Sequence, residues 1–129
     1  MKKIIVMLTV TVFCVAVFAF AVAETKPELR PAQKVMQARA AWLAAIGKNL
    51  DAGNFTAVAK DAGELAAQTK KIGDSHPNPL GKELTLAISS LAGEISAAAA
   101  AKDGATVKAK LGAIKGKCGD CHAKIRDKK

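Results

Sequence analysis

The chain has 129 residues and a mass of 13.3 kDa, which is the size of one domain. Half of the residues are hydrophobic, but only 4% are aromatic and none is tyrosine. Because alanine dilutes the aliphatic residues, this composition disfavours a β-sandwich or barrel and favours helices. The formal charge of +9 argues against a disordered acidic segment and for an anionic partner.

The first 23 residues have the pattern of a secretory signal peptide. Two lysines follow Met1, residues 4–20 are apolar, and Ala21–Ala23 has the small-x-small pattern of a cleavage site. We predict cleavage after this triplet. The apolar run is also long enough for an uncleaved membrane anchor, which stays the alternative. Cys14 lies in mid-run rather than behind a small residue, so we expect it to leave with the signal and not to carry a lipid.

The remaining residues, 24–129, are predicted to form a single domain with a small core of its own. They keep Trp42 and Phe55 as aromatic residues, and 23 of the 106 are alanine. Alanine favours helices but buries little apolar area. We therefore expect another group to fill the centre of the domain.

Four helices are expected in this domain. In the first, Leu29, Met36, Leu43 and Leu50 recur every seven residues as an inward stripe. Ala32 and Ile46 take the intervening inward positions, a series that Arg39 interrupts.

The second helix is expected to begin after the capping residue Asn54 and to end at Gly73, and residues 74–79 form a proline-containing loop. The third helix is expected to end before Asp103-Gly104.

Each of these last three helices has one inward stripe of apolar or small residues. In chain order the stripes are Phe55, Val58, Ala62, Leu65, Thr69 and Ile72; Leu84, Ile88, Leu91, Ile95 and Ala99; and Val107, Leu111, Ile114, Cys118, Cys121 and Ile125. Short connections between helices of about 18 to 22 residues predict an all-α fold, an antiparallel up-down four-helix bundle.

The chemistry-bearing motif is Cys118-Gly119-Asp120-Cys121-His122, near the end of the fourth helix. This C-x-x-C-H spacing is typical of covalent haem c attachment, in which two thiols add to vinyl groups and the imidazole binds iron. On a helix the three side chains fall within about a 100° arc and can address one porphyrin. Export strengthens this interpretation, because haem is attached outside the cytoplasm.

Other uses of the cysteines are less well supported. A Cys118–Cys121 disulfide would close only a tiny loop, and a thioredoxin-like pair needs a strand-turn-helix context. A zinc site could combine Cys118, Cys121, His122 and the distant His76, although adjacent cysteine and histidine ligands crowd one metal. His76 lies between prolines in a loop, so we expect it to be solvent-exposed.

A four-helix chain with this motif near its C-terminus, and with Arg126 four places after His122, resembles the class II c-type cytochromes. The resemblance covers essentially all of residues 24–129. It extends to Gln33-Lys34-Val35-Met36 and to the ending from Gly116 to Lys128. The class implies a four-helix bundle that holds one haem c through Cys118 and Cys121, with His122 as the proximal iron ligand.

Two branches of the class differ at the sixth position of the iron. In cytochrome c prime an apolar side chain leaves the iron open to NO or CO, whereas in the low-spin cytochromes c-556 a methionine of the first helix binds it. The segment ending in Met36 is similar to the low-spin branch and implies Met36 as the distal ligand. Met36 also lies on the inward stripe, so we expect its thioether inside the bundle. The alternatives are a core-filling Met36, or Val35 over the iron of a gas-binding protein.

The resemblance and the motif together imply a periplasmic electron-transfer protein of the Gram-negative bacterial type. No paired carboxylates, nucleophile-base pair or phosphate-binding glycine loop supports an enzyme. Residues 105–129 carry a net charge of +6, whereas residues 24–104 carry +1. This basic end suits docking to an acidic patch on a redox partner, and export excludes nucleic acid. We expect no membrane contact after cleavage, and a homodimer stays open.

Overall fold

The computed structural model describes residues 28–126, which form helices joined by short connections and contain no strand. The elements in chain order are α2 (Pro31–Asp51), α3 (Phe55–Asp74), α4 (Pro79–Ala100), α5 (Gly104–Cys121) and the π-helical turn η1 (His122–Arg126). The predicted signal peptide, residues 1–23 with Cys14, lies outside the described residues. Of the helices that are described, none is both long and apolar enough to cross a membrane.

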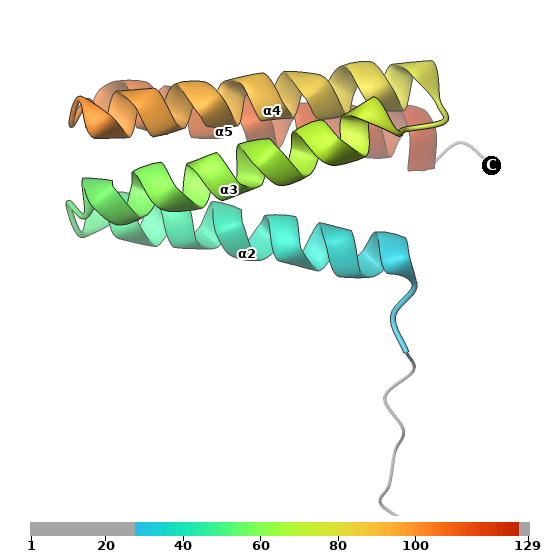
Figure 1. The fold of residues 1–129 in the computed structure, drawn as a ribbon, viewed down its shortest axis with the longest axis horizontal. Helices are drawn as coiled ribbons and strands as arrows, with labels where there is room; N and C mark the ends of the chain where they lie inside the picture. Colours follow the sequence, from blue (N-terminus) through green and yellow to red (C-terminus); the bar gives the residue numbers. More distant parts are fainter. Residues whose placement is uncertain (1–27, 127–129) are drawn as a thin grey trace, which may run out of the picture. The chain divides into compact units, whose positions relative to one another are not determined.

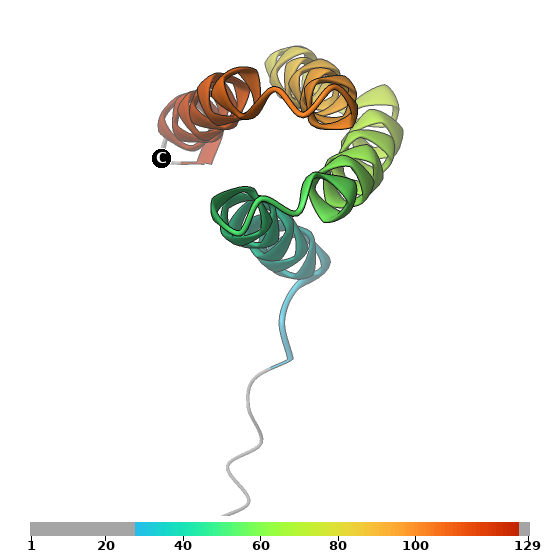
Figure 2. The same ribbon diagram turned by 90° about the vertical axis from the view of Figure 1, so that its left-hand side faces the viewer.

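The chain divides into two compact units, Met1–Pro31 and Ala32–Lys129. Only residues 28–31 of the first unit are described, and the second unit contains the helical fold. Within it the helices lie side by side and alternate in direction (Figure 1). The end-on view in Figure 2 shows that they follow one another around the fold, so that α5 returns to the side of α2. The predicted all-helical fold is confirmed for this part of the chain.

Side-chain caps set the beginnings of three helices. Asn54 accepts a hydrogen bond from the backbone N–H of Ala57 at 3.2 Å, and Asn78 accepts one from that of Gly81 at 3.0 Å. Asp103 does the same for α5. Each cap satisfies an N–H that has no partner within its helix, which is why these short polar residues start helices. The predicted cap at Asn54 is confirmed.

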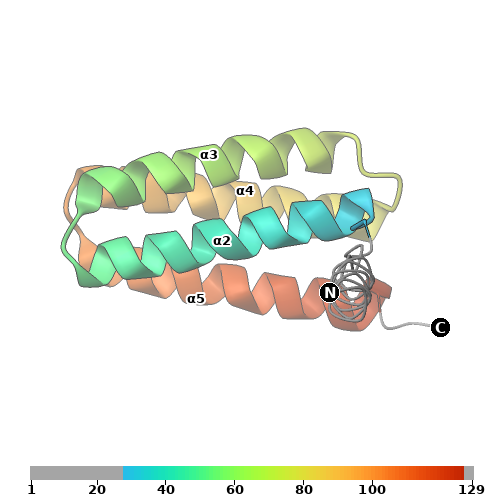
Figure 3. The same cartoon turned by 90° about the horizontal axis from the view of Figure 1, so that it is seen from below.

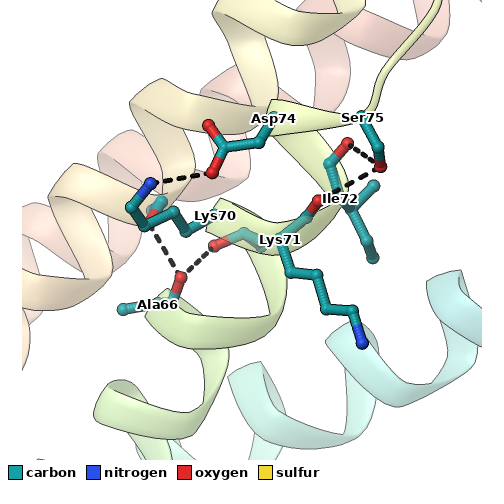
Figure 4. Close-up of polar contacts among 8 residues, drawn as sticks. Ala66, Lys70, Lys71, Ile72, Asp74 and Ser75 are labelled. Atoms are coloured by element: carbon teal, nitrogen blue, oxygen red, sulfur yellow. Dashed lines mark hydrogen bonds and ion pairs between the residues drawn. The ribbon is translucent and has the colours of Figure 1, made fainter.

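The C-terminal turn of α3 is closed by polar side chains (Figure 4). The Ser75 hydroxyl donates to the carbonyl oxygen of Lys71 at 3.1 Å, or of Ile72 at 3.3 Å. Lys70 and Asp74 form an exposed ion pair at 2.8 Å. The helix therefore continues through Gly73, where we expected it to end. Gly73 is buried because Leu86 of α4 packs against it: a Cβ at this position would lie 2.7 Å from Leu86 Cδ2.

The core is built from aliphatic and small residues of all four helices. The stripes predicted for the last three helices are largely confirmed, although several of their members are only half-buried. The buried apolar cluster consists of Ile46, Val58, Ala62, Leu65, Ile88, Ala92, Ile95, Ala99, Val107, Leu111 and Ile114. Trp42 and Phe55 are half-buried at its edge, so the few aromatic residues do not fill its middle.

The predicted inward face of the first helix is confirmed in part. Ile46 is buried as expected, and Leu43 and Leu50 pack against the core, but Met36 is exposed. Leu29 precedes the helix, which begins at Pro31. The prediction is wrong towards the start of the helix because a heptad pattern fixes a stripe on a helix but not the neighbours that cover it.

The second half of α2 contacts its neighbouring helices. Asn49 donates to Asp61 of α3 at 3.1 Å, and the nearby Ile46 is fully buried. On the side facing α5, a Cβ at Gly47 would lie 4.0 Å from Leu111 Cδ2. Both neighbours of α2 therefore meet it close to Ile46.

Candidate functional site

Cys118 and Cys121 lie one turn apart at the end of α5. Cys118 and Cys121 are both free thiols and half-buried, and Cys118 packs against the buried apolar cluster. They extend the same stripe as the fully buried Ile114 one turn earlier. The site is thus continuous with the core and open to solvent on one side.

His122 follows at the point where the helix changes its winding. It is half-buried and is the first residue of the π-helical turn η1, and its backbone N–H bonds to the Cys118 carbonyl oxygen. Single π-helical turns occur frequently at functional sites. The periodicity predicted helical structure as far as Ile125, which is confirmed, but it gave no sign of the π winding.

The fold brings the start of α2 to the same end as these residues. Figure 3 shows the first turns of α2 and the last turns of α5 at one end of the fold, together with the α3–α4 connection. Residues almost ninety positions apart in sequence are therefore neighbours. Which of them face the cysteines depends on the rotation of α2.

Arg39 lies opposite the end of α5. Gly47 lies beside Leu111, and α2 and α5 run in opposite directions (Figure 1), so Arg39, eight residues before Gly47, is level with the segment that carries Cys118. The side chain of Arg39 is only 7% exposed, and its Nε donates a long hydrogen bond of 3.5 Å to Gln68 Oε1 of α3. Its Nη2 atom is buried and has no hydrogen-bond partner in the part of the chain that the structure describes. The sequence identified Arg39 only as an interruption of an apolar series, and that interruption was the signal that a charged side chain is buried here.

The charges of Arg39 and the two cysteines act on one another. Burial lowers the pKa of the Arg39 guanidinium, and the charges of Cys118 and Cys121 oppose this change. Burial raises the pKa of the Cys118 thiol, and the positive charge of Arg39 opposes that rise. Arg39 therefore lies within electrostatic range of both thiols.

The structure does not bring Met36 to the cysteines. Met36 is 41% exposed, so the expectation that its thioether lies inside the bundle is wrong. Val35, beside it, is half-buried and lies four positions before Arg39, one turn away on the same face. The role of Met36 as an iron ligand is a separate question, which stays a prediction.

His76 is held against the fold rather than freely exposed. The ring is half-buried, and its Nδ1 lies 3.1 Å from the backbone N of Asn78, which donates to it. A Cβ at Gly81 would lie 2.6 Å from Nδ1 of His76. The loop lies at the same end as the cysteines, but no three His, Cys, Asp or Glu side chains among residues 28–126 are grouped to hold a metal ion.

Basic side chains surround the cysteine-bearing segment. Lys115 and Lys124 are exposed, and Lys117 is half-buried beside Cys118. Lys110 is different because it forms an ion pair with Glu94 that joins α5 to α4. The lysines near the cysteines therefore place positive charge around the open side of the site.

The chemistry of this donor set suits haem c. Two free thiols and an adjacent imidazole are the groups that hold the porphyrin and its iron. The buried aliphatic cluster against which Cys118 packs supplies apolar surface next to these groups. Arg39 Nη2, which has no partner among the described residues, could donate a hydrogen bond to an anionic acceptor. Cys118, Cys121 and His122 are the residues that can hold such a group. The chain matches no protein-family model, no curated protein and no solved structure.

Proposed function

We propose that this chain is an exported c-type cytochrome that transfers single electrons, and that its domain is an antiparallel four-helix bundle of class II. Cys118 and Cys121 would hold one haem c through thioether bonds, and His122 would bind its iron. One observation carries the proposal: two free, half-buried thiols and the next imidazole extend the core stripe of α5, opposite the buried Arg39, whose Nη2 has no hydrogen-bond partner among the described residues. The predicted signal peptide, residues 1–23, supports export to the periplasm.

When bound, haem c would supply an iron ion that gains and loses one electron while its ligands stay the same. The contribution of the chain is to hold and shield that centre. The two cysteines would hold it on α5, and the buried side chains of Ile114 and Ile46 would exclude water from the core side of the site. The half-burial of the thiols leaves the other side of the site accessible, which would let electrons pass to a partner.

The surface charge supports a protein partner rather than a small substrate. Positive charge is concentrated in residues 105–129, next to the site. An acidic patch on a donor or acceptor would bring the two redox centres together rapidly and reversibly. Electron transfer by such docking needs no catalytic residues in this chain.

The sixth position of the iron distinguishes two versions of this function. The sequence resemblance favours Met36 as the distal ligand, which gives a closed, low-spin electron carrier. The exposure of Met36 and the half-burial of Val35 favour an open distal site instead, as in a protein that binds NO or CO. We retain the electron carrier as the proposal because Met36 lies one turn before the buried Arg39, on the same face of α2.

The test is expression of the full chain in a bacterium that matures c-type cytochromes. We expect the mature band to stain for covalent haem on a denaturing gel, and N-terminal sequencing to begin at Glu24. Cys118→Ser with Cys121→Ser should abolish the stain. Cys14→Ser is the matched control, because the signal peptide should carry Cys14 away without loss of haem. A colourless mature protein that contains zinc would contradict the proposal.

A further inference from the structure

Arg39 is a buried cation that the helical fold alone does not explain. A guanidinium has five N–H donors and no acceptor, and it stays protonated in proteins. In this structure Gln68 Oε1 accepts a long hydrogen bond of 3.5 Å from Arg39 Nε, while the buried Nη2 has no partner among the described residues. An unmade hydrogen bond on a buried charge is costly, so a group outside the chain is the natural acceptor.

The position of Arg39 indicates what that group must be. Arg39 is level with the segment of α5 that carries Cys118, where the haem would be attached. A thioether carries no charge, so neither sulfur could balance the guanidinium once the haem is attached. The positive charge of Arg39 would therefore stay buried and would need an anionic partner from the haem.

A haem c brings two carboxylates into the same space. Resting on the proposed function, we propose that Arg39 donates a hydrogen bond from Nη2 to a carboxylate of the haem, and that its charge raises the reduction potential. Arginine is suited to this task because its planar fork matches a carboxylate and because its long stem reaches away from the helix. Gln68 positions the fork by holding Nε.

The effect on the potential follows from the sign of the charge. Reduction adds one negative charge to the haem, and a nearby cation in a poorly hydrated site stabilises that added charge. Removing the cation therefore favours the oxidised form and lowers the potential. A side chain that merely fills space would not have this effect.

The experiment compares haem-loaded variants of the full chain. Arg39→Met removes the charge and the donors but keeps an unbranched apolar stem. Lys48→Met, on the exposed side of the same helix, removes an equal charge and is the matched control. Reduction potentials are measured by spectroelectrochemistry, and hydrogen bonding to the carboxylates is followed through the propionate bending band in the resonance Raman spectrum.

We expect Arg39→Met to shift the one-electron equilibrium about tenfold towards the oxidised form, a fall of about 59 mV, and to shift the propionate band. Lys48→Met should change the potential much less and leave the band in place. Arg39→Lys keeps the charge and should retain most of the reduction potential. If Arg39→Met does not fold, Arg39→Lys becomes the test variant. In that case a shift of the propionate band is the result that the inference requires.

Three results would overturn the inference. If Arg39→Met and Lys48→Met behave alike, Arg39 has no special relation to the haem, although the proposed function stands. A lower potential with an unchanged propionate band would exclude the carboxylate contact. A wild-type chain without covalent haem would remove the proposed function and this inference together, so the two failures are distinguishable.

Discussion

The imidazole of His76 packs directly against the backbone of Gly81, across the connection between α3 and α4. A Cβ at Gly81 would lie 2.6 Å from Nδ1 and 2.7 Å from Nε2 of the ring. The ring is fixed there by the backbone N–H of Asn78, which donates to Nδ1. Glycine at this position therefore lets the loop close over the first turn of α4, at the same end of the fold as the two cysteines.

Gly81→Ala should destabilise the protein by about 1–3 kcal/mol, because the methyl group forces the ring and its loop to move. Gly93→Ala is the control on the same helix, since nothing lies within 4 Å of a Cβ there. We expect it to be neutral or to stabilise by up to about 1 kcal/mol. Urea unfolding of both variants measures the difference. Adding His76→Ala to Gly81→Ala should restore part of the loss, and additive effects in the double variant would contradict the packing argument.

Met36→Ala tests which side of α2 faces the iron of the proposed haem. If Met36 is the distal ligand, its removal should convert a low-spin ferric spectrum to high-spin and abolish the weak long-wavelength band from sulfur to iron. Val35→Ala is the neighbouring control and should leave the spin state unchanged. A wild-type protein that is already high-spin and binds CO readily would instead identify an open distal site beside Val35.

Ile46 anchors α2 on the rest of the fold, because it is fully buried between helices. Ile46→Ala should lower the free energy of unfolding by about 2–5 kcal/mol, and Ile46→Val by only about 0.5–1.5 kcal/mol. Chemical denaturation followed by circular dichroism gives both values. Leu43→Ala is expected to cost less than Ile46→Ala, since Leu43 is only half-buried; the opposite order would contradict the deeper burial of Ile46.

Asp103 makes the start of α5 sensitive to acid. Hydrogen bonds from the side chain and the backbone N–H of Thr106 lower the pKa of its carboxyl. Because the folded-state pKa lies below the unfolded one, the stabilisation is complete above the unfolded value and is lost as the pH falls through the folded value. Asp103→Asn keeps the cap without the charge. Its free energy of unfolding, measured with urea, should therefore fall less than that of the wild type between about pH 5 and pH 2.

Thr106→Ala provides the control for this pH dependence. It removes the hydroxyl that donates to Asp103 Oδ2 at 2.6 Å but leaves the backbone N–H bond of 3.0 Å to Oδ1. We expect the pKa of Asp103 to move back towards its ordinary value, and the acid-dependent loss of stability to become smaller. Identical pH profiles for the wild type and Thr106→Ala would contradict this assignment.

Lys115 tests the proposed docking of an acidic redox partner. Its side chain is exposed one turn before Cys118, so Lys115→Gln should slow association a few-fold and weaken its dependence on salt. Stopped-flow reduction by an acidic electron donor at several ionic strengths measures both effects. Lys60→Gln on α3 removes the same charge away from residues 105–129 and should change the rate little. Equal effects of the two substitutions would indicate that only the net charge matters.

Local sequence determined most of the helical structure. Asn54 was identified as a cap because its short side chain satisfies an N–H of the next turn, and its neighbour Phe55 begins the helix. Val58, Leu65 and Ile95 were placed in the core because their spacing matches the helical period. The C-x-x-C-H motif likewise needs only adjacent residues on one helix, so its position on α5 followed from spacing.

The tertiary structure decided what faces these residues. Met36, Arg39 and Ile46 share the inward face that the heptad of α2 predicts, but neighbouring helices cover that face unevenly, so that Arg39 and Ile46 are buried and Met36 is exposed. Periodicity within one helix cannot include the shape and polarity of its neighbours. For the same reason the sequence showed Arg39 as an interruption, and only packing against α3 and α5 revealed it as a buried cation near Cys118 and Cys121.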